Sequence, residues 1–226
     1  MDFATDVFLR YLLDPRILAG ALISLLVAVA AQAIGTVLGL VLALMRMARP
    51  RWIAGPASAF VWLFRGTPPL VQLLLLYFGL PQLGIRLDPL QAGLIGLSLY
   101  AAAYMSEILR AAILAVDPGQ TEAARAIGMR APGVLAWVVM PQALRIALPP
   151  FGNEFASMMR TTSLLSVISF EELLRATTLA INETFRPMEL YAVAAVWYLA
   201  MYSVWQIVQN RLERSAGKSL ATTQEG

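Results

Sequence analysis

Four charged residues lie within long apolar segments of this sequence, and they are the side chains best placed to do chemistry. They are Arg65, Glu107, Glu154 and Arg160. A charge at the centre of a bilayer costs roughly 2.5–3.5 kcal/mol on insertion scales, so each needs a partner or a function. Their formal charges sum to zero, which leaves mutual pairing open as the alternative to contact with a charged solute.

The residues around Arg65 predict an anion site at a helix start. Thr67 is expected to cap a resumed helix with Pro68 at its first position, which would aim free N–H groups at an anion such as a carboxylate. Gln72, one turn further on, could add a hydrogen bond or make a polar contact between helices. The alternative is a structural break in which Arg65 pairs with Glu107.

Two polar stripes are predicted to line a pathway. Tyr100, Tyr104 and Glu107 have i, i+4, i+7 spacing and share one helix face, with Arg110 one turn beyond Glu107. Simple packing with a Glu107–Arg110 pair is the alternative for that stripe.

The second stripe lies later in the chain, where Glu154, Met158 and Thr161 also share a face, whereas Arg160 points away from it. Glu154 has an alternative role too, because a carboxylate in the first turn after Pro150 would offset a helix dipole.

Catalysis by familiar protein groups is largely excluded. The sequence contains neither cysteine nor histidine, so disulfides, Cys/His zinc sites, axial histidine ligands and thiolate or imidazole catalysis are ruled out. A membrane-embedded enzyme is therefore a remote interpretation. We expect no catalytic residue, no metal and no cofactor bound by this chain.

The composition is that of a membrane protein. Of 226 residues, 59% are hydrophobic and 14% are charged, whereas soluble domains have about 45–50% and about 25%. Residues 17–44 form a run of 28 without formal charge, about 42 Å as a helix, which exceeds the roughly 30 Å hydrocarbon core. Further spans are predicted at 57–80, 90–116, 150–170 and 190–208.

The sequence thus predicts an all-α membrane protein with five transmembrane helices. Residues 1–226 form one transmembrane domain, with core spans over 17–208 and a cytoplasmic tail over 209–226. Breaks at Pro68–Pro69 and between residues 148 and 153 predict a cavity lined by irregular backbone. Residues 171–186 have the spacing of a short amphipathic helix, either an external lid or docking surface or a plain connector.

The distribution of lysine and arginine predicts the orientation. With five spans, one side receives ten of these cations within the loops and the other receives five. Cytoplasmic loops carry the excess of Lys and Arg. We therefore predict an N-terminus outside and a C-terminus inside.

The loop after the third predicted span has the pattern of a folded element. Asp117-Pro118-Gly119 forms a turn, a short polar helix follows, and Gly128 ends it. Glu122-Ala123-Ala124, three residues, Gly128, nine residues and Val138-x-Met140-Pro141 resemble the EAA loop of bacterial ABC importer permeases. The alternative is a solvated connector.

This resemblance implies a coupling role for residues 117–141. In that family the short helix docks into a groove of a cytoplasmic ATPase and carries its closing motion to the membrane. The residues that correspond to the motif are Glu122, Ala123, Ala124, Gly128 and Pro141. ATP and Mg²⁺ would be used by the partner ATPase, and this chain would be a transport subunit rather than an enzyme.

Other motifs resemble the polar amino-acid uptake permeases, over roughly residues 17–208. They are Arg65-Gly-Thr-Pro-Pro-Leu-Val-Gln72, Tyr104 through Arg110, and Pro141-Gln-Ala-Leu-Arg145 through Asn153. The resemblance implies the type I ABC importer permease fold in the bacterial cytoplasmic (inner) membrane. It also implies a second permease subunit, identical or related, two copies of an ABC ATPase, and an external solute-binding protein that delivers a polar amino acid.

One position departs from the family pattern. Those permeases commonly read Lys-Asp-Thr-Ser-Leu where this chain reads Arg160-Thr161-Thr162-Ser163-Leu164. Thr161 therefore replaces a carboxylate able to hold an ammonium group, next to the pathway candidate Ser163. Either Glu154 supplies the charge, or the ligand is unusual, or this subunit is the non-binding half of a heterodimer.

A different class of function stays open from the residues alone. Intramembrane carboxylates often form proton relays, so Glu107 or Glu154 could serve a proton-coupled secondary transporter or channel. The organised loop around Glu122 favours the ATP-driven importer.

Overall fold

The computed structural model describes residues 3–224, and side chains as far as residue 215. Every regular element in this range is helical, so the predicted all-α fold is confirmed. The elements are α1 (Thr5–Leu12), α2 (Pro15–Arg46), α3 (Arg51–Gly66), α4 (Pro69–Leu74), η1 (Leu75–Gly79), η2 (Leu80–Leu83), α5 (Pro89–Leu114), α6 (Pro118–Ala126), α7 (Ala131–Gly133), η3 (Val134–Val139), α8 (Met140–Thr161), η4 (Thr162–Ile168), α9 (Leu173–Thr184) and α10 (Pro187–Gln224).

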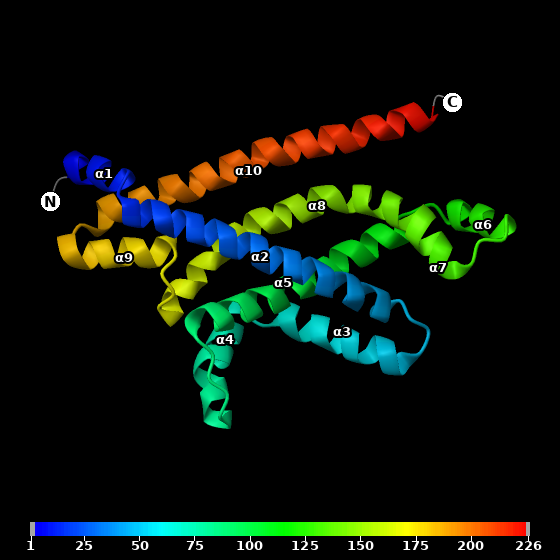
Figure 1. The fold of residues 1–226 in the computed structure, drawn as a ribbon, viewed down its shortest axis with the longest axis horizontal. Helices are drawn as coiled ribbons and strands as arrows, with labels where there is room; N and C mark the ends of the chain where they lie inside the picture. The colour runs from blue at the N-terminus through cyan, green and yellow to red at the C-terminus, as the bar shows by residue number, and fades with distance from the viewer. Residues whose placement is uncertain (1–2, 225–226) are drawn as a thin grey trace.

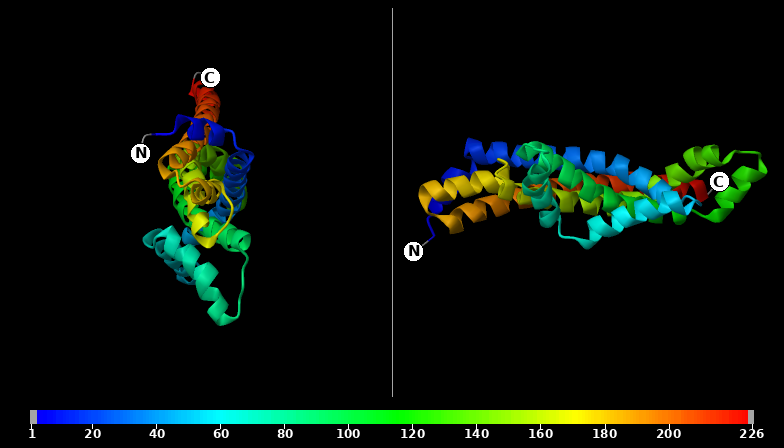
Figure 2. Two further views of the ribbon diagram at one scale, coloured as in Figure 1. Left: turned by 90° about the vertical axis from the view of Figure 1, so that its left-hand side faces the viewer. Right: turned by 90° about the horizontal axis from the view of Figure 1, so that it is seen from below.

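The long helices form an elongated bundle whose two ends differ (Figure 1). The short helices α1 and α9 lie at one end, and α6 and α7 lie at the other. The arm formed by α4, η1 and η2 projects from the bundle (Figure 2). The charge-poor helices thus run between an α1/α9 end and an α6 end, as a membrane-spanning bundle requires.

Length and composition allow four helical segments to cross a membrane, and five when a bent pair is counted as one span. The four are Pro15–Arg46, Pro89–Leu114, Ala131–Ile168 and Pro187–Ser215, and the bent pair joins Arg51–Gly66 to Pro69–Leu83 at an angle of 106°. The break predicted at Pro68–Pro69 is therefore present, and it turns the chain sharply.

The break predicted between residues 148 and 153 is wrong. α8 continues through Pro149 and Pro150, and together with α7, η3 and η4 it belongs to one segment over Ala131–Ile168. Pro149 and Pro150 lack N–H groups, and two side chains of α10 donate hydrogen bonds to backbone carbonyls in this stretch. Trp205 Nε1 donates to Gly152 O (2.8 Å), and Gln209 Nε2 donates to Pro149 O (3.3 Å). Bonds from α10 thus support the proline-containing stretch.

The centre of the bundle is the pair α2 and α5, which pack backbone to backbone. A Cβ added to Gly35 would collide with Ala101, and one added to Gly39 would lie 2.6 Å from the Cβ of Met105. Small residues allow this approach, the usual basis of helix association in membranes. By contrast α3 is mostly exposed and contacts only one side of this pair.

Two elements differ from the predicted boundaries. Residues 5–12 form α1, which lies before the first predicted span and packs through Tyr11 into the core. From residue 209 the predicted tail continues α10 as far as Gln224, and residues 225–226 lie outside the described range.

Candidate functional site

Glu107 on α5 is the centre of an intramembrane ion cluster. Its carboxylate lies 2.8 Å from Arg46 Nη2, 3.3 Å from Arg65 Nη1 and 3.1 Å from Arg110 Nη2. The alternatives that paired Glu107 with Arg65 and with Arg110 are therefore both present. Arg46, 61 residues earlier, is the partner that the local pattern did not reveal.

The aromatic part of the α5 stripe faces the same cluster. Tyr100 and Tyr104 are in contact, with ring centroids 4.7 Å apart, and the Arg65 guanidinium lies 5.4 Å from the centroid of Tyr104. A cation over an aromatic face is attracted by the negative potential of the ring. Tyr104 therefore helps to hold the Arg65 side chain beside α5.

Glu154 on α8 is a partly buried carboxylate close to the same group of side chains. It lies within electrostatic range of Arg65 and of Tyr100. Its Oε1 atom is buried and has no hydrogen-bond partner among the described residues. Because α8 runs unbroken through Pro150, Glu154 is not in a first helical turn, and the dipole-offsetting alternative for it is wrong.

The other candidates on this helix use their polar groups locally. Thr161 Oγ1 donates to Ser157 O (2.9 Å), and Ser163 Oγ donates to Arg160 O (2.7 Å). Met158 is completely buried in the core of the subunit, which removes it from a pathway formed by this subunit's surface. Arg160 lies over the ring of Tyr202, 5.8 Å from its centroid.

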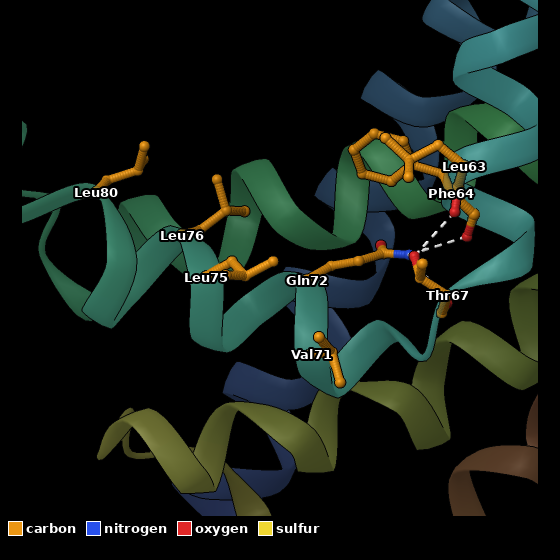
Figure 3. Close-up of a pocket in the computed structure, with 8 residues that line it drawn as sticks. All are labelled: Leu63, Phe64, Thr67, Val71, Gln72, Leu75, Leu76 and Leu80. Carbon is orange, nitrogen blue, oxygen red and sulfur yellow. Dashed lines mark hydrogen bonds between the residues drawn. The ribbon is translucent and has the colours of Figure 1, made fainter. Parts of the chain in front are cut away.

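The break after α3 is stabilised from within (Figure 3). Gln72 Nε2 donates to Phe64 O (2.9 Å), Thr67 O (3.1 Å) and Thr67 Oγ1 (2.8 Å). Thr67 in turn donates to Leu63 O (2.8 Å) and ends α3, whereas Pro68 precedes the first residue of α4. The prediction that Thr67 caps the resumed helix is therefore wrong, since Thr67 and Gln72 satisfy carbonyl groups that the break would leave free.

Beside this break is a cavity of about 230 Å³ with mainly aliphatic walls. The residues that line it are Leu63, Phe64, Thr67, Val71, Gln72, Leu75, Leu76 and Leu80. The cavity has no charged lining residue, so the charged cluster around Glu107 is a separate site.

The loop after α5 folds as its sequence predicts. Asp117 accepts a hydrogen bond from Gly119 N (2.8 Å) and begins α6. Gly128 has a φ of 85°, in the left-handed region that favours glycine, and its N–H donates to Arg125 O (2.9 Å). The helix therefore starts and stops at the predicted turn residues.

The two alanines of this loop have different positions. Ala124 is buried, and Met129 N donates to its carbonyl (3.1 Å), whereas Glu122 and Ala123 are exposed. Pro141 lies in the first turn of α8, after the π-helical η3. One face of α6 thus packs on its own subunit, and the face with Glu122 and Ala123 is exposed.

At the opposite end, sequence reasoning missed a buried polar hub. The Glu172 carboxylate accepts hydrogen bonds from Ser24 Oγ (3.2 Å), Tyr198 Oη (3.0 Å) and Arg175 N (2.8 Å). Burial raises the pKa of Glu172 above its ordinary value, although these hydrogen bonds oppose the shift. The hub joins α2, α9 and α10, helices that are distant in sequence, so no local pattern reveals it.

Comparisons with known proteins agree on one family. A family model described as the binding-protein-dependent transport system inner membrane component matches residues 35–218. The probable amino-acid ABC transporter permease protein YckA of Bacillus subtilis (strain 168) is 37% identical over 200 residues, which cover 88% of each chain. The octopine transport system permease protein OccM of Rhizobium meliloti is 42% identical over 194 residues, 82% of this chain and 79% of that protein.

A solved structure agrees with these relatives. The crystal structure of an amino acid ABC transporter with histidines matches with a TM-score of 0.88 and 37% identity, covering 95% of this chain and 100% of that one. The resemblance first indicated by the loop around Glu122 is therefore confirmed, together with the importer permease fold. The chain belongs to the family of inner membrane components of binding-protein-dependent transport systems, and within it to the amino-acid ABC transporter permeases.

Proposed function

We propose that this permease subunit moves a polar amino acid with a cationic group through the bacterial cytoplasmic membrane, into the cell. The main support for a solute with a cationic group is the buried Glu154 Oε1 atom, which has no hydrogen-bond partner among the described residues. A buried acceptor without a partner is costly, and an ammonium or guanidinium group would satisfy it. The relative OccM is named for the transport of octopine, which supports an amino-acid-like solute.

Arg65 and Tyr104 complete the proposed site. The Arg65 guanidinium is within electrostatic range of Glu154, so one side of the bundle presents a negative and a positive group to a solute that carries both charges. Thr161 does not replace the aspartate that related permeases commonly have at this position, because its hydroxyl donates a hydrogen bond to Ser157 O of its own helix. Glu154 is then the acidic residue that acts in its place.

The partners follow from the family. We propose a second permease subunit, two copies of an ABC ATPase that uses ATP and Mg²⁺, and an external binding protein that delivers the solute. The exposed face of α6, with Glu122 and Ala123, would contact the ATPase. In this arrangement the α6 end is cytoplasmic and the α1/α9 end is outside, as the distribution of Lys and Arg predicts.

Uptake into proteoliposomes that contain the complete complex tests the proposal. L-arginine and L-glutamine are the probes, with ATP inside and the binding protein outside. We expect ATP-dependent uptake of at least one probe that is insensitive to a proton uncoupler. Uptake that needs a proton gradient and no ATP would support the secondary transporter and reject the proposal.

The variant Glu154→Gln tests the site itself. The amide has no negative charge, so we expect apparent affinity to fall roughly tenfold or more, as for loss of a hydrogen bond to a charged group. Glu213→Gln is the matched control, since Glu213 accepts a hydrogen bond within α10, from Gln209 Nε2 (2.7 Å). Unchanged affinity in Glu154→Gln would remove Glu154 from the solute site.

A further inference from the structure

The cluster around Glu107 has more positive charge than its own residues neutralise. Three guanidinium groups share the Glu107 carboxylate. Glu154 acts on Arg65 only through longer-range electrostatics, because no ion pair joins the two among the described residues. The Nε atoms of Arg46 and Arg110 are also buried without a hydrogen-bond partner among the described residues. Three cations and one carboxylate leave this partly buried cluster with a net positive charge, which attracts a further anion.

The cluster also has room for such an anion. Arg46, Arg65, Tyr104 and Glu107 border an open cleft of about 430 Å³ between α3 and α5, which Ser58, Val61, Trp62 and Gly66 complete. This volume is large enough for a solute the size of an amino acid. The cleft therefore combines excess positive charge with access.

The three arginines differ in how firmly their helices are held. Arg46 and Arg110 belong to α2 and α5, which pack backbone to backbone at Gly35 and Gly39. Arg65 belongs to the peripheral helix α3, and its side chain is 44% exposed against 14% for Arg46. The bond between Arg65 and Glu107 is therefore the member of the cluster that can open while the others stay closed.

We propose that this cleft is a carboxylate-binding station at which the carboxylate of the solute replaces Glu107 as the counter-ion of Arg65. The inference rests on the proposed function, because it assigns the cleft to the same solute. Glu107 keeps Arg46 and Arg110 as partners after the exchange, so it is not left as an unpaired charge. The exchange removes the ion pair that joins α3 to α5, whereas the buried Ala57 and Val61 keep α3 on the bundle. Solute binding thereby loosens the half of the bent span that precedes the break at Thr67.

A distance measurement on the whole complex tests this exchange. The chain has no native cysteine, so spin labels can be placed specifically at Ala59→Cys on α3 and Leu114→Cys on α5, both exposed in this chain. The complex is studied in lipid nanodiscs without ATP. The probes are L-arginine and L-glutamine, each paired with its decarboxylated counterpart, agmatine or 4-aminobutanamide.

We expect the imported amino acid to shift the distance distribution between α3 and α5, and its decarboxylated counterpart to cause no shift. In Glu107→Gln the shifted distribution should be present without any solute. Arg65→Gln removes the same ion pair from the other side and leaves Glu107 neutralised by two arginines, so it should show the same shift. A shift in both variants could not be explained by misfolding of Glu107→Gln alone. The wild-type complex should bind the amino acid roughly tenfold more tightly than its decarboxylated counterpart. In both variants this preference should be lost.

Two results would overturn the inference. One is an equal shift with the decarboxylated probe, and the other is an unshifted distribution in both variants. If the wild-type complex imports neither amino acid with ATP, the proposed function fails. If it imports one while α3 and α5 keep their distance, the carboxylate station alone fails.

Discussion

At the scale of single residues, this permease uses the carboxylates of Glu172 and Glu107 in opposite ways. Glu172 accepts three hydrogen bonds and has no cation among them, whereas Glu107 is bound by three guanidinium groups. Burial disfavours the charged form of Glu172 and raises its pKa, although the hydrogen bonds it accepts favour the charged form. Glu172 thus joins three helices through neutral donors, and Glu107 joins three arginines through ion pairs.

The pH response of Glu172 can be measured as stability. Because its pKa is raised in the folded state, its contribution to stability is fully present below the ordinary carboxyl pKa and is lost as pH rises through the folded value. We expect the melting temperature of the purified wild-type complex to fall from acidic to neutral pH more than that of Glu172→Gln. Identical pH profiles for the two proteins would show that Glu172 is ionised or unimportant. Glu183→Gln is the control, because its partner Arg16 is exposed and it should follow the wild type.

At the scale of helices, close packing of α2 on α5 is the feature on which the site depends. Glu107 can reach Arg46 only because small residues let these two helices approach along their length. The helix α10 adds a second constraint by bonding the backbone of α8 at Pro149 and Gly152. These contacts hold α2, α5, α8 and α10 together, whereas α3 is left comparatively free.

Substitution of one glycine tests the packing of α2 on α5. Gly39→Ala places a methyl group 2.6 Å from the Cβ of Met105 and 3.0 Å from Ala102 O. We expect a loss of about 1–3 kcal/mol in the free energy of unfolding, as for overpacked cores. Gly55→Ala in α3 is the matched control, because its new Cβ meets nothing within 4 Å, and alanine is a better helix former by about 1 kcal/mol. Equal stability of the two variants in denaturant titration would contradict the assigned packing.

At the scale of the whole molecule, the proposed function depends on surfaces at opposite ends of the bundle. α6 presents Glu122 and Ala123 at one end, and α1 and α9 form the other (Figure 1). An importer needs ATPase contact on the cytoplasmic side and delivery of solute on the outer side. The separation of these ends along the bundle is what the proposed topology requires.

Charge reversal at Glu122 tests the coupling surface. Glu122→Lys should weaken association of the ATPase by roughly tenfold, or about 1.4 kcal/mol, because like charges would then meet a basic partner surface. Membrane insertion should be unchanged, since α6 lies outside the spans. Binding of the ATPase is measured by pull-down from detergent, with Glu183→Lys at the α1/α9 end as the control for that binding. Uptake is measured in proteoliposomes. Wild-type binding and uptake in Glu122→Lys would reject the coupling role.

Labelling of single cysteines tests the topology. Leu9 in α1 and Ile127 after α6 are 58% and 80% exposed in this chain, so cysteine at either position should react with an impermeant maleimide. In intact cells we expect Leu9→Cys to be labelled and Ile127→Cys to be protected until the membrane is opened. The reverse pattern would place the N-terminus inside and overturn the orientation.

The local amino-acid sequence was sufficient to predict several features of this protein. Apolar length predicted the membrane helices, Pro68 and Pro69 predicted the break after α3, and the turn residues Asp117 and Gly128 predicted both ends of α6. Each depends on neighbours within a few residues, through backbone dihedral preferences and the length of helix needed to cross a bilayer. The same locality made the motif around Glu122 recognisable.

Partner choice between distant residues was decided only by the tertiary structure. Neither Arg46 as a partner of Glu107 nor Ser24 and Tyr198 as partners of Glu172 follows from spacing, because these bonds depend on how closely α2, α5 and α10 approach. The continuity of α8 through Pro150, and the bonds that α10 donates to its backbone, are likewise seen only in the tertiary structure. Hydrogen bonds and ion pairs act over about 3 Å, so the residues that satisfy a buried polar group are determined by packing rather than by sequence distance.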